Sequence, residues 1–192
     1  MTALVPVAFW LLPAPPDASW LQNHLQALAT RHGGPAFEPH VTLHVGTRPA
    51  GLAVEPILAT VARQAGVLEL ECLETAHSAA YYKALFAPLV EAPAPAGAGL
   101  PALRARLLDA LARAGAPDSD YVLAPHLSLL YGTFDAALRH DLAGSQSLLG
   151  RRIRFDRIAA VRPAPGSVDL ARVADWEVFG HCRLAVPPNA NP

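Results

Sequence analysis

The sequence has no excess of charge and no cysteine framework, and each absence excludes a class of protein. Its 15 basic and 16 acidic residues give a net charge of −1, without the basic surplus of proteins that grip long nucleic acids. Two cysteines, Cys72 and Cys182, offer neither metal-ligand spacing nor a disulfide framework. We therefore expect reduced thiols in a cytoplasmic protein. One local site could still bind a small anionic substrate.

A long hydrophobic run is also missing. The apolar N-terminal stretch, residues 1–12, is too short to span a bilayer and lacks the positive n-region of a signal peptide. We interpret it as the first core strand and expect no membrane partner. The 52% content of hydrophobic residues excludes a disordered chain, and 192 residues suit a single domain.

The order of predicted elements favours an α+β fold with antiparallel sheets over a doubly wound one. Residues 1–192 are predicted to form a single bilobal domain whose lobes share strands, with a link between the halves at residues 92–99. Asp17 or Ser19 is predicted to cap the first helix. Helices are predicted near residues 17–33, 54–66, 103–111 and 136–142, and strands near 4–12, 37–47, 67–73, 79–87, 125–133, 153–160 and 176–184.

One nine-residue phrase occurs twice in the chain. PHVTLHVGT at residues 39–47 returns as PHLSLLYGT at residues 125–133. Each copy places a hydroxyl two residues after a histidine: Thr42 after His40, and Ser128 after His126. Residues i and i+2 of a strand share a face, so each strand presents an imidazole and a hydroxyl together.

These groups suit the opening of a cyclic phosphodiester. A histidine gives or takes a proton near neutral pH, so two imidazoles could serve as base for water and acid for the leaving oxygen. Two hydroxyls could hold the phosphate oxygens as charge builds on them. We assign His126 as the base and His40 as the acid, roles that the near-symmetry of the motifs leaves interchangeable.

The two motifs resemble those of the 2H phosphoesterases, which are named for paired His-x-Thr/Ser-x sequences. HVTL at residues 40–43 and HLSL at residues 126–129 both fit, and the longer strings are similar to the plant- and yeast-type cyclic phosphodiesterases. FWLLP at residues 9–13, YYKALF at 81–86 and DWE at 175–177 add softer matches in the same order.

The resemblance implies a two-lobed fold with pseudo-twofold symmetry and both histidines in a central cleft. It implies hydrolysis of nucleoside 2′,3′-cyclic phosphates to 2′-phosphates, or of ADP-ribose 1″,2″-cyclic phosphate, without a cofactor. His40 and His126 take the catalytic positions, and Thr42 and Ser128 the phosphate-binding positions. Tyr131 matches a substrate-contacting aromatic and Trp10 a cleft aromatic. A small cyclic-phosphate nucleotide is the expected partner of a monomeric protein.

Other interpretations of the histidines are weaker. A zinc site built from His40, His44 and His126 is disfavoured, because four residues of a strand span roughly 13 Å. A Ser128 nucleophile lacks the Gly-x-Ser-x-Gly elbow. An enzyme acting on RNA 2′,3′-cyclic ends and a non-catalytic nucleotide-binding module stay open as alternatives, although binding alone needs no acid–base pair.

Three aromatic residues pose a question of orientation. Tyr131 follows His126 by five residues, so an ideal strand would point it to the opposite face unless the strand bends. Tyr81 and Tyr82 point opposite ways, so at most one should face the cleft. Lys83 beside them could attract phosphate, but we expect it at a solvated edge.

Overall fold

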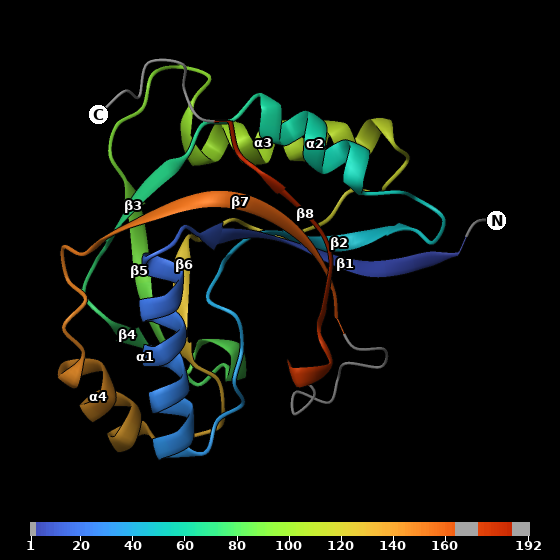
Figure 1. Ribbon diagram of the computed structural model, residues 1–192. Coiled ribbons are helices and arrows are strands. Elements are labelled where there is room, and N and C mark those ends of the chain that lie inside the picture. Colours follow the sequence, from blue (N-terminus) through green and yellow to red (C-terminus); the bar gives the residue numbers. More distant parts are fainter. Residues whose placement is uncertain (1–2, 164–172, 186–192) are drawn as a thin grey trace.

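The computed structural model describes residues 3–163 and 173–185 of the chain. Eight strands and four α-helices form the fold within these ranges (Figure 1). The strands are β1 (Leu4–Pro13), β2 (Val41–Pro49), β3 (Leu68–Cys72), β4 (Ala76–His77), β5 (Leu85–Glu91), β6 (His126–Leu130), β7 (Arg152–Arg162) and β8 (Glu177–Arg183). The helices are α1 (Asp17–His32), α2 (Glu55–Arg63), α3 (Gly99–Arg113) and α4 (Ala136–Ser145), with short 3₁₀ turns at Tyr81–Lys83 and Val173–Asp175.

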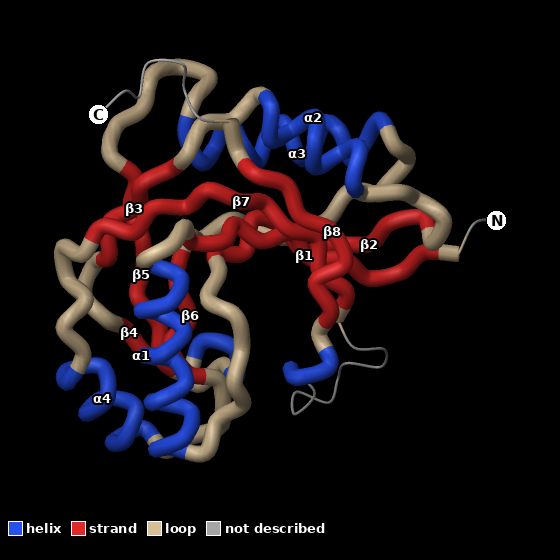
Figure 2. Tube along the Cα trace, viewed as in Figure 1, coloured by secondary structure: helices blue, strands red, loops and turns tan. Residues whose placement is uncertain are grey.

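The strands form one antiparallel sheet. Its order is β2-β1-β7-β3-β5-β4, with β6 paired to β5 and β8 paired to β7. The sheet is strongly curled (Figure 2). As a result β2 and β6, which carry the two motifs, come within 8 Å of each other between Cα atoms. The predicted α+β fold with antiparallel strands is therefore confirmed, and its curvature brings the repeated phrases together.

Strand β1 explains why the N-terminal run is apolar throughout. One face places Val7, Phe9 and Leu11 in the main core. The other face joins Trp10 to a second, smaller cluster, whose members are Ala8, Trp10, Leu12, Ala159 and Val161. From Val7 onward β1 is buried on both faces, and a strand buried in this way has no polar side, which is why residues 7–12 lack alternation. The second cluster forms the floor beneath the candidate site.

The helices cover the curled sheet from outside. α2 packs against α3 and β8, while α1 packs against β6 and β1 (Figure 1). Gly33 ends α1 with φ of 80°, as the sequence predicted. The predicted cap of α1 is wrong: Pro16 stands at the N-cap position, and the Asp17 carboxylate instead accepts a hydrogen bond from the backbone of Arg154 at 3.1 Å.

Two predicted strands are shorter than expected. The first motif strand begins at Val41, because Pro39 has no N–H to donate to a ladder, and residues 34–40 form a loop. The strand predicted from residue 79 begins only at Leu85. There the Ser78 hydroxyl donates to the Lys83 carbonyl at 2.8 Å and accepts from the Ala80 amide, which closes a turn.

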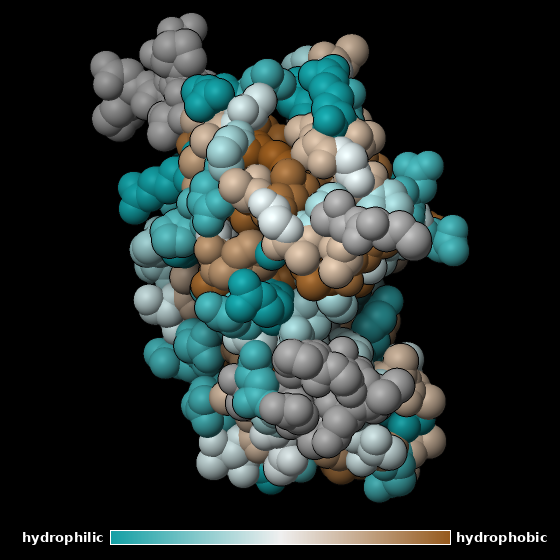
Figure 3. All heavy atoms as spheres, turned by 90° about the vertical axis from the view of Figure 1, so that its right-hand side faces the viewer, coloured by the Kyte–Doolittle hydropathy of each residue, from teal (hydrophilic) through white to brown (hydrophobic). Residues whose placement is uncertain are grey.

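Other expectations concern the ends and the surface. The predicted frayed tail, residues 187–192, lies outside the described residues. Cys72 and Cys182 are free thiols, and no described helix is long and apolar enough to cross a membrane. Seen from the side where β1 begins and β2 ends, hydrophobic side chains gather at the height of α2, α3 and these two strands, with hydrophilic side chains around them (Figure 3).

Candidate active site

Both motif strands contain a β-bulge at the same place. In β2, Thr42 pairs with Trp10 and His44 pairs with Phe9, so Leu43 is the extra residue. In β6, Ser128 pairs with Phe86 and the ladder resumes one residue late at Leu130, so Leu129 is the extra residue. Each bulge thus follows the hydroxyl residue of its motif and locally interrupts the alternation of faces.

The bulges decide which side chains enter the cleft. Val45 and Tyr131, five residues after the two histidines, line the same cavity as the motif residues. Tyr131 therefore does not lie on the opposite face that an ideal strand would give it: the bulge interrupts the strand, which is the exception that the prediction from sequence left open. His44 turns instead toward Phe9, with ring centroids 6.4 Å apart. His44 therefore points away from the cleft, in addition to being too far along the strand from His40 to share a metal ion with it.

A cavity of about 340 Å³ lies between the two motif strands. It holds all six side chains that the sequence singled out. Its described lining includes no carboxylate, and much of it is aromatic. The lining residues are Ala8, Trp10, His40, Thr42, Val45, Tyr82, Lys83, Tyr121, His126, Ser128, Tyr131, Val161, Pro163 and Trp176.

The two histidines are held in matching ways. His40 Nδ1 lies 2.6 Å from the carbonyl oxygen of Glu38, and His126 Nδ1 lies 2.7 Å from that of Ala124. A carbonyl oxygen only accepts, so each Nδ1 carries the proton and donates it two residues back along the chain. In each neutral imidazole, Nε2 then keeps its lone pair for a ligand.

Burial sets the charge of both imidazoles. Desolvation lowers the pKa of His40 from 6.5 to about 4; its hydrogen bond to Glu38 opposes this shift and the nearby His126 adds to it. Burial also lowers the pKa of His126, a shift that the bond to Ala124 opposes and the charge of Lys83 reinforces. Both histidines are therefore neutral at pH 7 in the empty site. Among the described residues, no group of three His, Cys, Asp or Glu side chains gathers as metal ligands.

The two hydroxyl positions differ in their bonding. Ser128 is 5% exposed, and its hydroxyl donates to the Tyr82 carbonyl at 2.9 Å and also hydrogen-bonds the Tyr131 hydroxyl. The Thr42 side chain faces the cavity, while its backbone carbonyl accepts a hydrogen bond from the Tyr121 hydroxyl at 3.1 Å. Ser128 must therefore rotate to donate to a ligand, whereas Tyr121 fixes the backbone that carries Thr42.

Aromatic rings position the cleft residues. The Tyr131 ring stacks on Phe37 with centroids 3.8 Å apart, and burial raises the pKa of the Tyr131 hydroxyl. Trp10 is 3% exposed, and His40 covers one face of its indole. Trp10 is thus a support for the histidine as well as a cavity wall.

The sequence did not single out every residue of the cavity. Tyr82 lines it and Tyr81 does not, as their opposite orientations predicted. Trp176 and Tyr121 were not assigned to the site. Trp176 had a signal in its DWE string, whereas Tyr121 stands in a loop without any pattern. Lys83 was expected at a solvated edge, but it is half-buried and lines the cavity.

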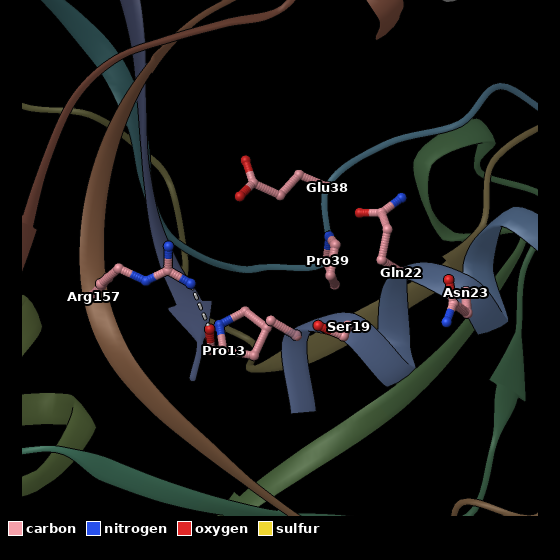
Figure 4. Close-up of a pocket in the computed structure, with 8 residues that line it drawn as sticks. Pro13, Ser19, Gln22, Asn23, Glu38, Pro39 and Arg157 are labelled. Atoms are coloured by element: carbon pink, nitrogen blue, oxygen red, sulfur yellow. Dashed lines mark hydrogen bonds between the residues drawn. The ribbon is translucent and has the colours of Figure 1, made fainter. Parts of the chain in front are cut away.

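A second hollow of about 360 Å³ lies near the segment that carries His40. Figure 4 shows Glu38, Pro39, Gln22 and Arg157 around it. The Arg157 guanidinium already donates to the Pro13 carbonyl at 2.8 Å and to the Asp156 carboxylate at 3.1 Å. No histidine is among the described residues that line this hollow, whereas the other cavity has two histidines, each with a hydroxyl beside it. The histidine cavity is therefore the better candidate for an active site.

Comparison with solved structures identifies the architecture. Escherichia coli LigT in complex with 3′-AMP superposes with a TM-score of 0.57, at 18% identity over 95% of this chain and 99% of LigT. TT0787 of Thermus thermophilus gives 0.57 at 17% identity, and a protein described as a phosphoesterase gives 0.55 at 16%, each over 95% of this chain and 99% of the other. The chain has the LigT fold.

The LigT fold is that of the 2H phosphoesterases, so the fold implied by the sequence resemblance is confirmed. No protein-family model and no curated protein sequence matches the chain. At identities below one fifth, the agreement with the LigT fold extends to architecture alone. The chemistry must be argued from the cavity itself.

Proposed function

We propose that this protein is a phosphoesterase that hydrolyses cyclic phosphodiesters of small nucleotides, using two histidines and no metal. The observation that carries the proposal is the matched pair of imidazoles, each fixed through Nδ1 with Nε2 left for a ligand, in a cavity whose described wall has no carboxylate. Binding alone needs no such pair, which argues against a non-catalytic nucleotide-binding module.

The reaction follows from these groups. One Nε2 takes a proton from water as the water oxygen attacks phosphorus, and the other imidazole, in its protonated form, gives a proton to the departing sugar oxygen. One P–O bond forms and one breaks, leaving a phosphomonoester. Thr42 and Ser128 donate hydrogen bonds to the non-bridging oxygens, on which negative charge builds. Solvent then returns both imidazoles to their starting states.

We assign the base to His126 and the acid to His40. The burial of His40 keeps it neutral in the empty site, so an acid role requires that the bound phosphate raise its pKa. A phosphate anion next to a buried imidazole does this, because an opposite charge nearby favours the protonated form. Binding of the substrate would therefore bring about the protonation of His40 that the acid role needs. In the empty site His40 would stay neutral, so no buried cation would be present there.

The walls of the cavity support a small nucleotide as the substrate. Trp176 and Tyr82 have rings 5.4 Å apart at the cavity edge, and flat aromatic rings are suited to stack on a base. LigT, which has the same fold, has been crystallised with 3′-AMP, with ATP and with NADP+. The net charge of −1 disfavours long RNA as the substrate.

A panel of cyclic phosphates tests the proposal, with the products identified by phosphorus NMR. Nucleoside 2′,3′-cyclic phosphates and ADP-ribose 1″,2″-cyclic phosphate should each be compared with an oligonucleotide that ends in a 2′,3′-cyclic phosphate. We expect the mononucleotides to be opened to 2′-phosphates. Faster opening of the oligonucleotide would favour an enzyme of RNA ends, and failure of every substrate would overturn the proposal.

A further inference from the structure

Lys83 is the only lysine in the chain, and it stands in the candidate site. It ends the short 3₁₀ turn Tyr81–Lys83, and Ala84 separates it from β5. The other side chains that line the cavity include no arginine. Lys83 is thus the one lysine or arginine among the described residues of the cavity wall.

The ammonium lies on the His126 side of the cavity. Lys83 Nζ is 4.4 Å from the centroid of the Phe86 ring, and that ring forms a T-shaped pair with His126, with centroids 5.6 Å apart. The charge of Lys83 acts on His126, whereas the neighbouring charge that acts on His40 is His126 itself. Lys83 therefore stands beside the reacting position and not between the two imidazoles.

No carboxylate forms an ion pair with this cation within the part of the chain that the structure describes. The ion pairs found there all involve arginines, and the described cavity wall contributes no acidic side chain. A half-buried ammonium that faces such a cavity is a site for an anionic group of a ligand. The reacting phosphate already has two imidazoles and two hydroxyls, so this group is a different one.

We propose that Lys83 binds a second anionic group of the substrate, so that the preferred substrate is a cyclic-phosphate nucleotide bearing a further phosphate. This inference rests on the proposed function and narrows its substrate class. A nucleotide with a single cyclic phosphate fills the reacting position but leaves Lys83 without a partner. A phosphate elsewhere on the nucleotide supplies that partner.

A matched pair of substrates tests this preference. Adenosine 2′,3′-cyclic phosphate and its 5′-phosphorylated form differ by one phosphate, and the ratio of their kcat/KM values measures what that phosphate contributes. We expect wild type to favour the phosphorylated form, Lys83→Met to reduce the ratio about tenfold or more, and Lys83→Arg to retain most of it. Arg63→Met, on the exposed surface of α2, serves as the control and should leave the ratio unchanged.

Binding of product-like ligands separates the two proposals. Calorimetry with adenosine 2′-phosphate and adenosine 2′,5′-bisphosphate on the same variants requires no turnover. If wild type hydrolyses neither cyclic phosphate yet binds the bisphosphate more tightly through Lys83, the proposed function fails and the anion site stands. An equal preference in wild type and Lys83→Met, in both turnover and binding, would overturn the role of Lys83.

Discussion

The indole of Trp10 lies flat against the imidazole of His40, with ring centroids 3.7 Å apart and planes inclined by 8°. Phe37 forms a T-shaped pair with the same imidazole, with centroids 6.4 Å apart. The hydrogen bond from Nδ1 to the Glu38 carbonyl fixes the tautomer of His40. The two rings fix the orientation of the imidazole and shield it from water. An imidazole held in this way is costly to protonate until an anion arrives.

The burial of His40 predicts a specific loss of stability in acid. Its pKa is 6.5 unfolded and about 4 folded, so between these values the unfolded chain binds more protons. Its contribution to the free energy of unfolding is intact above pH 6.5 and falls by roughly 3 kcal/mol as pH drops to 4. His40→Asn, whose amide can replace the Nδ1 donor, should escape this loss.

Urea unfolding at pH 7, 5.5 and 4 measures the effect. The free-energy difference between wild type and His40→Asn should shift in favour of the variant as pH falls. His140→Asn, at an exposed histidine of α4, provides the control. A difference that stays constant with pH would show that His40 is not buried as a neutral group.

The assignment of His40 as acid and His126 as base predicts which alanine variant regains activity on a substrate with a better leaving group. p-Nitrophenolate departs without a proton, so a nucleoside p-nitrophenyl phosphodiester needs no general acid. His40→Ala should lose about 10²-fold or more on a cyclic phosphate but much less on the aryl ester, whereas His126→Ala should stay slow on both. Rescue of His126→Ala in place of His40→Ala would reverse the two roles.

The two hydroxyls should act mainly on the chemical step. Thr42→Val and Ser128→Ala each remove a donor to the charge that develops on phosphate, so we expect kcat to fall about 10²-fold while KM changes less. Tyr131→Phe keeps the stack on Phe37 and loses only the bond to Ser128, so its effect should be several-fold. Steady-state kinetics on all three variants checks this order, and a Tyr131→Phe defect larger than that of Ser128→Ala would contradict it.

Catalysis by the histidine pair predicts full activity in the presence of a chelator. The alternative of a zinc site required His44 to lie beside His40, but the bulge at Leu43 turns His44 toward Phe9 in the core. Dialysis against EDTA, followed by assay, should leave kcat/KM unchanged. Activity that is lost in EDTA and restored by zinc would defeat the metal-free mechanism.

The sequence revealed the motif pair because its signal is local. In both copies a histidine follows a proline and a hydroxyl residue follows two positions later. This pattern predicts two equivalent strands even when the strands that pair with them are unknown. The bulges at Leu43 and Leu129 have no such signal, because a bulge arises from pairing with β1 and β5. The orientation of Tyr131 depends on one of these bulges, so the alternation of an ideal strand could not decide it.

The remaining cavity residues depended on long-range structure. Trp176 reaches the site from near the end of the chain, packing against the cluster of Trp10 on the floor of the cleft. Lys83 turns inward because the hydrogen bonds of Ser78 close a 3₁₀ turn where a strand was expected. The DWE string marks Trp176 without placing it in the cavity, and no local pattern places Lys83 there, so both placements required the folded chain.

The central claim is that two histidines open a cyclic phosphodiester. Phosphorus NMR of a nucleoside 2′,3′-cyclic phosphate, incubated with wild type and with the His40→Ala/His126→Ala double variant, tests it most directly. The account predicts that wild type converts the cyclic signal into one phosphomonoester signal and that the folded double variant leaves it unchanged. Hydrolysis by the double variant at a rate near that of wild type would contradict the account.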